Sequence, residues 1–132
     1  MIFYTYNSEF DEETLESIRS ENMARLQLQP SSHSIVYLFE EKEQNVGYVW
    51  IETFEEYVEA VEFFYKGNEK KRWGLYEFIV QLAYKQKKKR IMMSVPNSEY
   101  GMTFVKKWEG EIRERDGKDL HIDIPFLSYS GS

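Results

Sequence analysis

The sequence predicts a single α+β (α/β) domain in which strands and helices share one core. Its 132 residues match the usual size of one domain. A hydrophobic share of 42% and an aromatic share of 17% supply enough apolar surface for a packed interior. Segments with the two-residue period of strands also alternate along the chain with segments of helical period. We therefore expect one domain over residues 1–127 and a frayed tail over residues 128–132.

The first half of the chain predicts four strands and one helix. Residues 1–7 are rich in strand-forming side chains, and an acidic start near Asp11 leads into a helix with an apolar stripe at Leu15, Ile18 and Leu26. Pro30 ends that helix or a short successor. Three further strands are expected, separated by charged turns, over residues 34–39, 46–51 and 57–65.

The second half predicts two helices and three strands. After a turn at residues 67–69, apolar residues recur at helical spacing from Trp73 to Tyr84, and this helix ends in a basic tract over residues 85–90. Residues 91–95 form a short apolar strand, after which Asn97 or Ser98 can cap a helix that runs to Trp108. Two strands around an Asp-Gly turn at residues 116–117 complete the order.

Composition and charge narrow the classes of function. The sequence contains no cysteine, which excludes disulfides, thiolate nucleophiles and cysteine-ligated zinc. No signal peptide or membrane span is predicted, so we expect a cytoplasmic protein with no membrane partner. Residues 1–66 carry 14 acidic and 4 basic side chains, whereas residues 67–132 carry 9 acidic and 13 basic ones. This asymmetry fits either two ligands of opposite charge or ordinary surface solvation.

The predicted order of elements resembles that of the GNAT-type acyl-CoA N-acyltransferases over nearly the whole chain, and locally the resemblance is best from Val61 to Trp108. It implies a mixed central sheet of about seven strands flanked by helices. It further implies acetyl-CoA as co-substrate, with the loop before the central helix at its pyrophosphate and the backbone of residues 64–66 beside the thioester. These strand residues are Phe64, Tyr65 and Lys66.

The family's phosphate loop, a cation or Gln followed by two small residues at fixed spacing, is eroded in this chain. Alignment on Gly74 keeps Lys71 as the cation but places Tyr76 where a small residue is expected. Alignment on residues 67–72 restores the usual helix length but places Lys70 and Arg72 at the small positions. We favour the Gly74 register because helix length varies more easily than loop chemistry. It predicts cofactor contacts from Lys70, Lys71, Arg72, Trp73, Gly74, Leu75 and Tyr76.

The resemblance also directs attention to candidate catalytic groups. Many family members carry an Asn, and then a Tyr that protonates the leaving thiolate. If Asn97 is the family's Asn, and so a cofactor contact, Phe104 occupies the Tyr position; if Ser98 is, Val105 does. Neither side chain can donate a proton, so Tyr100 is the remaining candidate acid. Glu62 and Glu59 on the 57–65 strand are candidate bases for the acceptor amine, with Glu62 nearer the expected bend. Alternating glutamates are more often simply the solvent-exposed side of a strand.

Other chemistry finds less support in the sequence. His33 and His121 have no metal-ligand spacing, and we predict no metal site. Residues for Ser-His-Asp catalysis are present, but no nucleophile-elbow motif accompanies them. The basic tract over residues 85–90 lacks interleaved aromatic side chains, so no nucleic-acid partner is expected.

Two functions follow from the sequence. The first is an N-acetyltransferase that moves an acetyl group from acetyl-CoA to a primary amine on a small molecule or protein. The acceptor would be cationic if the acidic side chains Glu52, Glu55, Glu56 and Glu59 attract it. The second is a non-catalytic, GNAT-like protein-binding or regulatory module. A homodimer is compatible with either function.

Overall fold

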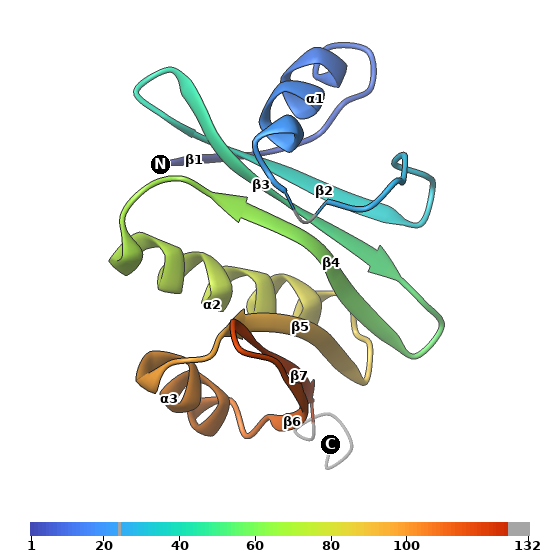
Figure 1. Ribbon diagram of the computed structural model, residues 1–132. Coiled ribbons are helices and arrows are strands. Elements are labelled where there is room, and N and C mark those ends of the chain that lie inside the picture. Colours follow the sequence, from blue (N-terminus) through green and yellow to red (C-terminus); the bar gives the residue numbers. More distant parts are fainter. Residues whose placement is uncertain (24, 127–132) are drawn as a thin grey trace. The chain divides into compact units, whose positions relative to one another are not determined.

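The computed structural model describes residues 1–23 and 25–126, so the predicted tail at 128–132 lies outside the described residues. The predicted order of strands and helices is confirmed (Figure 1). The elements are β1 (Ile2–Thr5), α1 (Glu12–Ser20), β2 (Ser34–Glu41), β3 (Gln44–Thr53), β4 (Tyr57–Tyr65), α2 (Glu69–Lys85), β5 (Arg90–Pro96), α3 (Glu99–Lys107), β6 (Glu111–Arg115) and β7 (Asp119–Pro125).

The strands form a mixed sheet, as predicted. Within the described residues it has seven strands in the order β1-β2-β3-β4-β5-β7-β6. The β1–β2, β2–β3, β5–β7 and β6–β7 pairs are antiparallel, whereas β4 and β5 run parallel. The parallel pair is joined by α2, because strands that run in the same direction need a crossover connection.

The chain divides into two compact units, and the division falls within two elements, β4 and α2. Unit 1 contains Met1–Thr53 and Val61–Leu75, and unit 2 contains Phe54–Ala60 and the chain from Tyr76 onward. The second half of β4 and the first part of α2 therefore belong to unit 1. Their other halves belong to unit 2.

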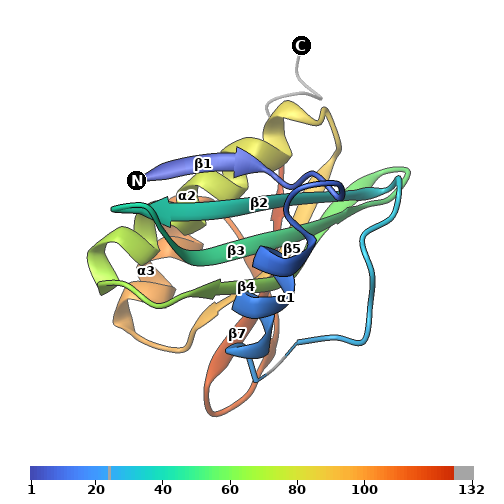
Figure 2. The ribbon, with the colours of Figure 1, turned by 90° about the horizontal axis from the view of Figure 1, so that it is seen from above.

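In unit 1 the core forms where α1 covers the middle of the sheet. Leu15 and Ile18 of α1 are buried in a cluster with Leu38, Tyr48 and Trp50 of β2 and β3. Figure 2 shows α1 lying alongside these strands. The helix ends at Ser20, well before the Leu26 that we expected to extend its apolar stripe, and Leu26 is 43% exposed.

In unit 2 the strands β5 and β7 carry the core. Their alternating residues Ile91, Met93, Val95, Leu120, Ile122 and Ile124 are buried, as the period of a strand requires. Of the two residues expected to cap α3, Asn97 and Ser98, the structure uses Ser98, whose Oγ accepts a hydrogen bond from the Gly101 amide at 3.1 Å. None of the described helices is both long and apolar enough to cross a bilayer.

Two helical glycines provide a matched test of this packing. A Cβ on Gly101 would lie 2.0 Å from the backbone oxygen of Pro96, whereas a Cβ on Gly74 would meet nothing within 4 Å. We expect Gly101→Ala to destabilise the protein by about 1–3 kcal/mol through overpacking. Gly74→Ala should stabilise it by about 0.5–1 kcal/mol through helix propensity. Denaturant unfolding measures both, and a loss of stability in Gly74→Ala would contradict the open helix face.

Candidate functional site

The start of α2 lies one turn earlier than the favoured alignment predicted. The helix begins at Glu69, where the Asn68 side chain accepts a hydrogen bond from the Lys71 amide at 2.9 Å. Gly74 is therefore inside the helix, and its amide takes part in the helical ladder. The Gly74 register was wrong: the loop before the helix is at residues 66–68, as the 67–72 register requires. The Asn68 cap, which the alignment did not consider, fixes this start.

Because α2 begins at Glu69, the groups of unit 1 that can contact an anion differ from those predicted. Trp73, Gly74 and Leu75 lie beyond the first turn of α2, and Leu75 is buried. The amide of Arg72 already donates to the Asn68 carbonyl at 3.1 Å. The amides of the first turn precede the helical ladder, and that of Lys71 is capped, which leaves the Glu69 and Lys70 amides for a ligand.

The cations around this helix start have partners within the protein. Lys71 Nζ lies 3.1 Å from a Glu41 carboxylate oxygen, and Arg72 donates to the Tyr65 carbonyl at 2.8 Å. Lys66 Nζ lies 3.2 Å from a Glu21 oxygen. The hydrogen bond from Lys71 lowers the pKa of Glu41. Both lysine pairs are solvent-exposed, and such pairs contribute only about 0–1 kcal/mol each, so a phosphate group can compete for them.

The end of β4, where we expected the thioester, remains held to its neighbours in unit 1. The Lys66 amide donates to the Val46 carbonyl at 3.0 Å, and a Cβ on Gly47 would lie 2.2 Å from the Phe64 carbonyl oxygen. The Tyr65 hydroxyl donates to Glu41 at 3.1 Å. The carbonyls of Phe64 and Tyr65 thus already face Gly47 and Arg72 respectively.

Glu62, the first candidate base, is buried at the centre of a hydrogen-bond network in unit 1. Arg19 donates to both carboxylate oxygens, with Nε 3.0 Å from Oε1 and Nη2 2.8 Å from Oε2. The Tyr48 hydroxyl donates to Oε1 at 2.7 Å, and the Leu26 amide donates to Oε2 at 3.2 Å. Burial, followed by the hydrogen bond to Glu62, raises the pKa of Tyr48. With four donors on its two oxygens and the side chain buried, Glu62 has little access to a substrate amine.

Arg19, which the sequence reading missed, connects this network to the segment after α1. Its guanidinium also donates to the Leu26 carbonyl at 2.7 Å and the Leu28 carbonyl at 3.0 Å, and it lies 4.7 Å from the centre of the Trp50 ring. The spacing held a signal, since Arg19 follows Leu15 by four residues and so shares the buried face of α1. The network therefore holds the backbone at Leu26 and Leu28 as well as forming the ion pair.

Glu59, the second candidate base, lies in unit 2 on the first half of β4. It is paired in register with Met92 of β5 and lines a cavity of about 330 Å³. The other lining residues are Ala60, Met92, Met93, Ser94, Arg113, Glu114, His121 and Ile122. Here the Ser94 hydroxyl lies 2.7 Å from His121 Nδ1, and His121 Nε2 lies 2.9 Å from an Asp116 carboxylate oxygen. Ser94 and His121 lie opposite each other because of the register in which β5 and β7 pair. The sequence alone did not reveal that register.

The start of α3 gives the Asn97 side chain a contact within the protein and leaves Tyr100 exposed. The Asn97 side chain donates to the Asp116 carbonyl at 3.2 Å, so it holds the turn between β6 and β7. Tyr100 is 66% exposed in the first turn of α3. Phe104 is buried against Tyr76, with ring centres 6.1 Å apart, and it has no proton to donate. In unit 2, Tyr76 thus serves as a core residue.

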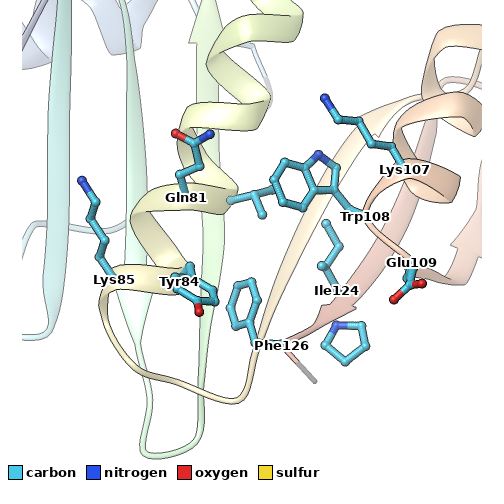
Figure 3. A pocket seen from close by; sticks show the side chains of 10 residues that line it. Gln81, Tyr84, Lys85, Lys107, Trp108, Glu109, Ile124 and Phe126 are labelled. Atoms are coloured by element: carbon cyan, nitrogen blue, oxygen red, sulfur yellow. The ribbon is translucent and has the colours of Figure 1, made fainter. Parts of the chain in front are cut away.

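A larger cavity of about 510 Å³ lies in unit 2 between the last turns of α2 and α3 (Figure 3). Its walls include the rings of Tyr84, Trp108 and Phe126, while Lys85 and Lys107 extend their ammonium groups away from it. The sequence did not predict this cavity. Its apolar walls suit binding rather than catalysis. Within residues 1–23 and 25–126, no cluster of three or more potential ligands could hold a metal ion.

Comparison with solved structures shows that the chain has the fold of the GNAT acetyltransferases. The PaiA N-acetyltransferase of Thermoplasma acidophilum, solved with coenzyme A, is 12% identical, with a TM-score of 0.62 over 96% of this chain and 100% of that one. A GNAT family acetyltransferase of Elizabethkingia anophelis with acetyl-CoA bound is 10% identical, with a TM-score of 0.59 over 95% and 97% of the two chains.

A third similar structure is the Campylobacter jejuni N-acetyltransferase PseH in complex with acetyl-CoA. It is 13% identical, with a TM-score of 0.60 over 95% of this chain and 99% of that one. No protein-family model matches the sequence, and no curated protein matches it either. The likeness is therefore one of fold, and it confirms the fold class that the order of elements predicted.

Substitution of the two carboxylates that Arg19 contacts tests the structural role of Glu62. Glu62→Gln removes the buried countercharge of the Arg19 guanidinium and should lower the free energy of unfolding by about 3–5 kcal/mol. Glu16 lies 3.4 Å from the same guanidinium but is 52% exposed, so Glu16→Gln should cost at most about 1 kcal/mol. Urea unfolding of both variants is the measurement, and equal losses would contradict the assignment.

Proposed function

We propose that this protein is an acetyl-CoA-dependent N-acyltransferase. The observation that supports it most is the shared fold, which extends over 95–96% of the chain in three structures solved with coenzyme A or acetyl-CoA. Fold likeness at 10–13% identity does not by itself fix an activity, so the proposal also depends on the chemistry of the chain's own residues.

The first turn of α2 is the proposed pyrophosphate site. Its Glu69 and Lys70 amides and the positive end of the helix dipole favour an anion. The side chains of Lys70, Lys71 and Arg72 would add positive charge. Lys71 would leave its ion pair with Glu41 to contact the phosphate. Among the other predicted cofactor contacts, Lys66 would place a positive charge beside the pyrophosphate site. Phe64 and Tyr65 would contact the cofactor through their backbone groups only. Trp73, Gly74, Leu75, Tyr76 and Asn97 are the members that their positions support least.

Glu59 is the proposed base, in preference to the fully bonded Glu62. Acetyl-CoA supplies a thioester whose carbonyl carbon is attacked by a primary amine. The proton that the amine loses would pass to Glu59, the carbon–sulfur bond would break, and Tyr100 would protonate the thiolate. Glu59 lines the cavity that also holds Ser94 and His121, which gives a substrate access to its carboxylate.

A cationic acceptor is the proposed substrate class, although fewer acidic residues are available than the sequence suggested. Glu52 accepts hydrogen bonds from Ser34 and Trp50, and Glu56 pairs with Lys89 at 2.9 Å. Glu55 and Glu59 are then the acidic side chains best placed to attract an amine. A cytoplasmic location and a homodimer remain predictions.

A non-catalytic binding module is the second candidate. The partners of Lys71 and Arg72 within the protein and the buried Phe104 favour it, because they weaken the case for cofactor binding and for an acid on α3. Titration calorimetry with acetyl-CoA separates the two functions. Binding favours the enzyme, whereas neither heat nor a thermal shift at millimolar ligand favours the module.

Two charge reversals on α2 locate the binding site. Lys70→Glu, in the first turn, should weaken acetyl-CoA binding by about tenfold because it places a carboxylate beside the phosphates. Lys85→Glu, in the last turn, makes the same charge change at the other end of the helix and should leave binding within about twofold. Calorimetry checks both, and equal weakening would contradict a site at the start of α2.

A further inference from the structure

Three side chains of unit 2 form a continuous hydrogen-bonded array outside the proposed acetyl-CoA site. Ser94 of β5 and His121 of β7 are directly opposed partners in the antiparallel pair. The Ser94 hydroxyl lies 2.7 Å from His121 Nδ1, and His121 Nε2 lies 2.9 Å from Asp116 Oδ2. The order hydroxyl, imidazole, carboxylate is that of a serine nucleophile with its base and its orienting acid.

The array is held by backbone rather than by long flexible side chains. Two of its members are on paired strands, and the third is anchored in the turn between β6 and β7. There the other carboxylate oxygen of Asp116 accepts hydrogen bonds from the Lys118 amide at 2.8 Å and the Asp119 amide at 2.6 Å. The hydrogen bond with His121, followed by these amides, lowers the pKa of Asp116 to about 2.

An ionised Asp116 determines the direction of the hydrogen bonds. A carboxylate can only accept, so His121 Nε2 carries the proton that faces Asp116. Nδ1 of the neutral imidazole is then the acceptor, and the Ser94 hydroxyl donates to it. The imidazole is thus oriented to remove the Ser94 proton, with the roles of the two ring nitrogens exchanged relative to the serine protease template.

The nucleophile is accessible. Ser94 is exposed, the His121 side chain is 39% exposed, and both line the cavity of about 330 Å³. The charged groups at this cavity are Glu59 from β4 and Arg113 and Glu114 from β6, and Arg113 is paired with Asp123 at 3.1 Å. The cavity therefore has two carboxylates and one guanidinium that is already paired. This charge disfavours anionic ligands and favours neutral or cationic ones.

We propose that Ser94 is an acyl-accepting nucleophile that hydrolyses small neutral or cationic esters, with His121 as its general base. Asp116 is a positioning residue that fixes the tautomer and orientation of His121. The reaction needs no acetyl-CoA, because the ester supplies the acyl group, although its cavity also contains Glu59, the base proposed for acetyl transfer.

The reaction balances with ester and water alone. The Ser94 oxygen bonds to the acyl carbon as its proton moves to His121 Nδ1, and the carbon–oxygen bond to the leaving group breaks. The leaving group takes that proton or departs as an anion, in which case the proton passes to water. A water molecule then attacks the acyl-serine, releases the carboxylic acid and returns a proton to the Ser94 oxygen.

The test uses p-nitrophenyl acetate with the full chain and no acetyl-CoA. We expect a burst of nitrophenolate, and one acetyl group on Ser94 when the acid-quenched protein is mapped by tandem mass spectrometry. Ser94→Ala should abolish both the burst and that modification. Ser20→Ala is the matched control, since Ser20 is an exposed serine of unit 1 that bonds only locally to Ser17. Circular dichroism confirms that both variants are folded.

Two further variants separate catalysis from structure. His121→Gln should slow acylation about 100-fold, since it keeps a polar side chain but removes the base. Asp116→Asn should slow acylation and move the acid limb of the pH–rate profile to lower pH, because the imidazolium form loses its carboxylate partner. A merely structural Asp116 would leave that limb in place. The proposal is overturned if Ser94→Ala retains the burst, or if acetyl groups appear only on lysines.

Discussion

Unit 1 depends on a guanidinium that is buried against a carboxylate. Arg19 and Glu62 are each 3% exposed, and neither would be tolerated there without the other. The same guanidinium holds two carbonyls of the segment after α1 and faces the Trp50 ring, so one side chain joins a helix, a strand and an irregular segment. Tyr48 completes the network from β3. The chain beyond the end of α1 at Ser20 thus supplies two of the acceptors for Arg19.

That constraint affects function directly. A glutamate in the middle of β4 invites a catalytic interpretation, but its lone pairs are committed to Arg19, Tyr48 and the Leu26 amide. The proposed function therefore assigns the role of proton acceptor to Glu59, which lines an open cavity, rather than to Glu62. In the same way, the Asn68 cap rather than a glycine decides where α2 begins and which amides can meet a phosphate.

The sequence predicted the fold because hydrophobic periods are local. The two-residue period of β5 and the helical spacing from Trp73 to Tyr84 can be read without knowledge of any partner. The order of elements then led to the correct fold class. Phe104 could also be excluded as a general acid from the sequence alone, because a phenylalanine side chain has no ionisable proton.

The site was harder to predict because its contacts are not local. Arg19 and Glu62 are 43 residues apart and meet only where α1 packs on the strands, whereas Ser94 and His121 are 27 apart and meet through the register of β5 and β7. The error at Gly74 had another cause: a glycine suggested a loop, yet the cap at Asn68 allowed the helix to continue through it. At this position the capping side chain, and not the glycine, determines where the helix begins.

The most direct test of an acetyl-CoA site on this fold is a ¹⁵N–¹H correlation spectrum recorded during titration with coenzyme A. We expect the largest shifts at the amides of residues 67–71, because the first turn of α2 would donate to the pyrophosphate. Shifts confined to the cavity around Trp108 and Phe126, or no shifts at saturating ligand, would contradict the assignment.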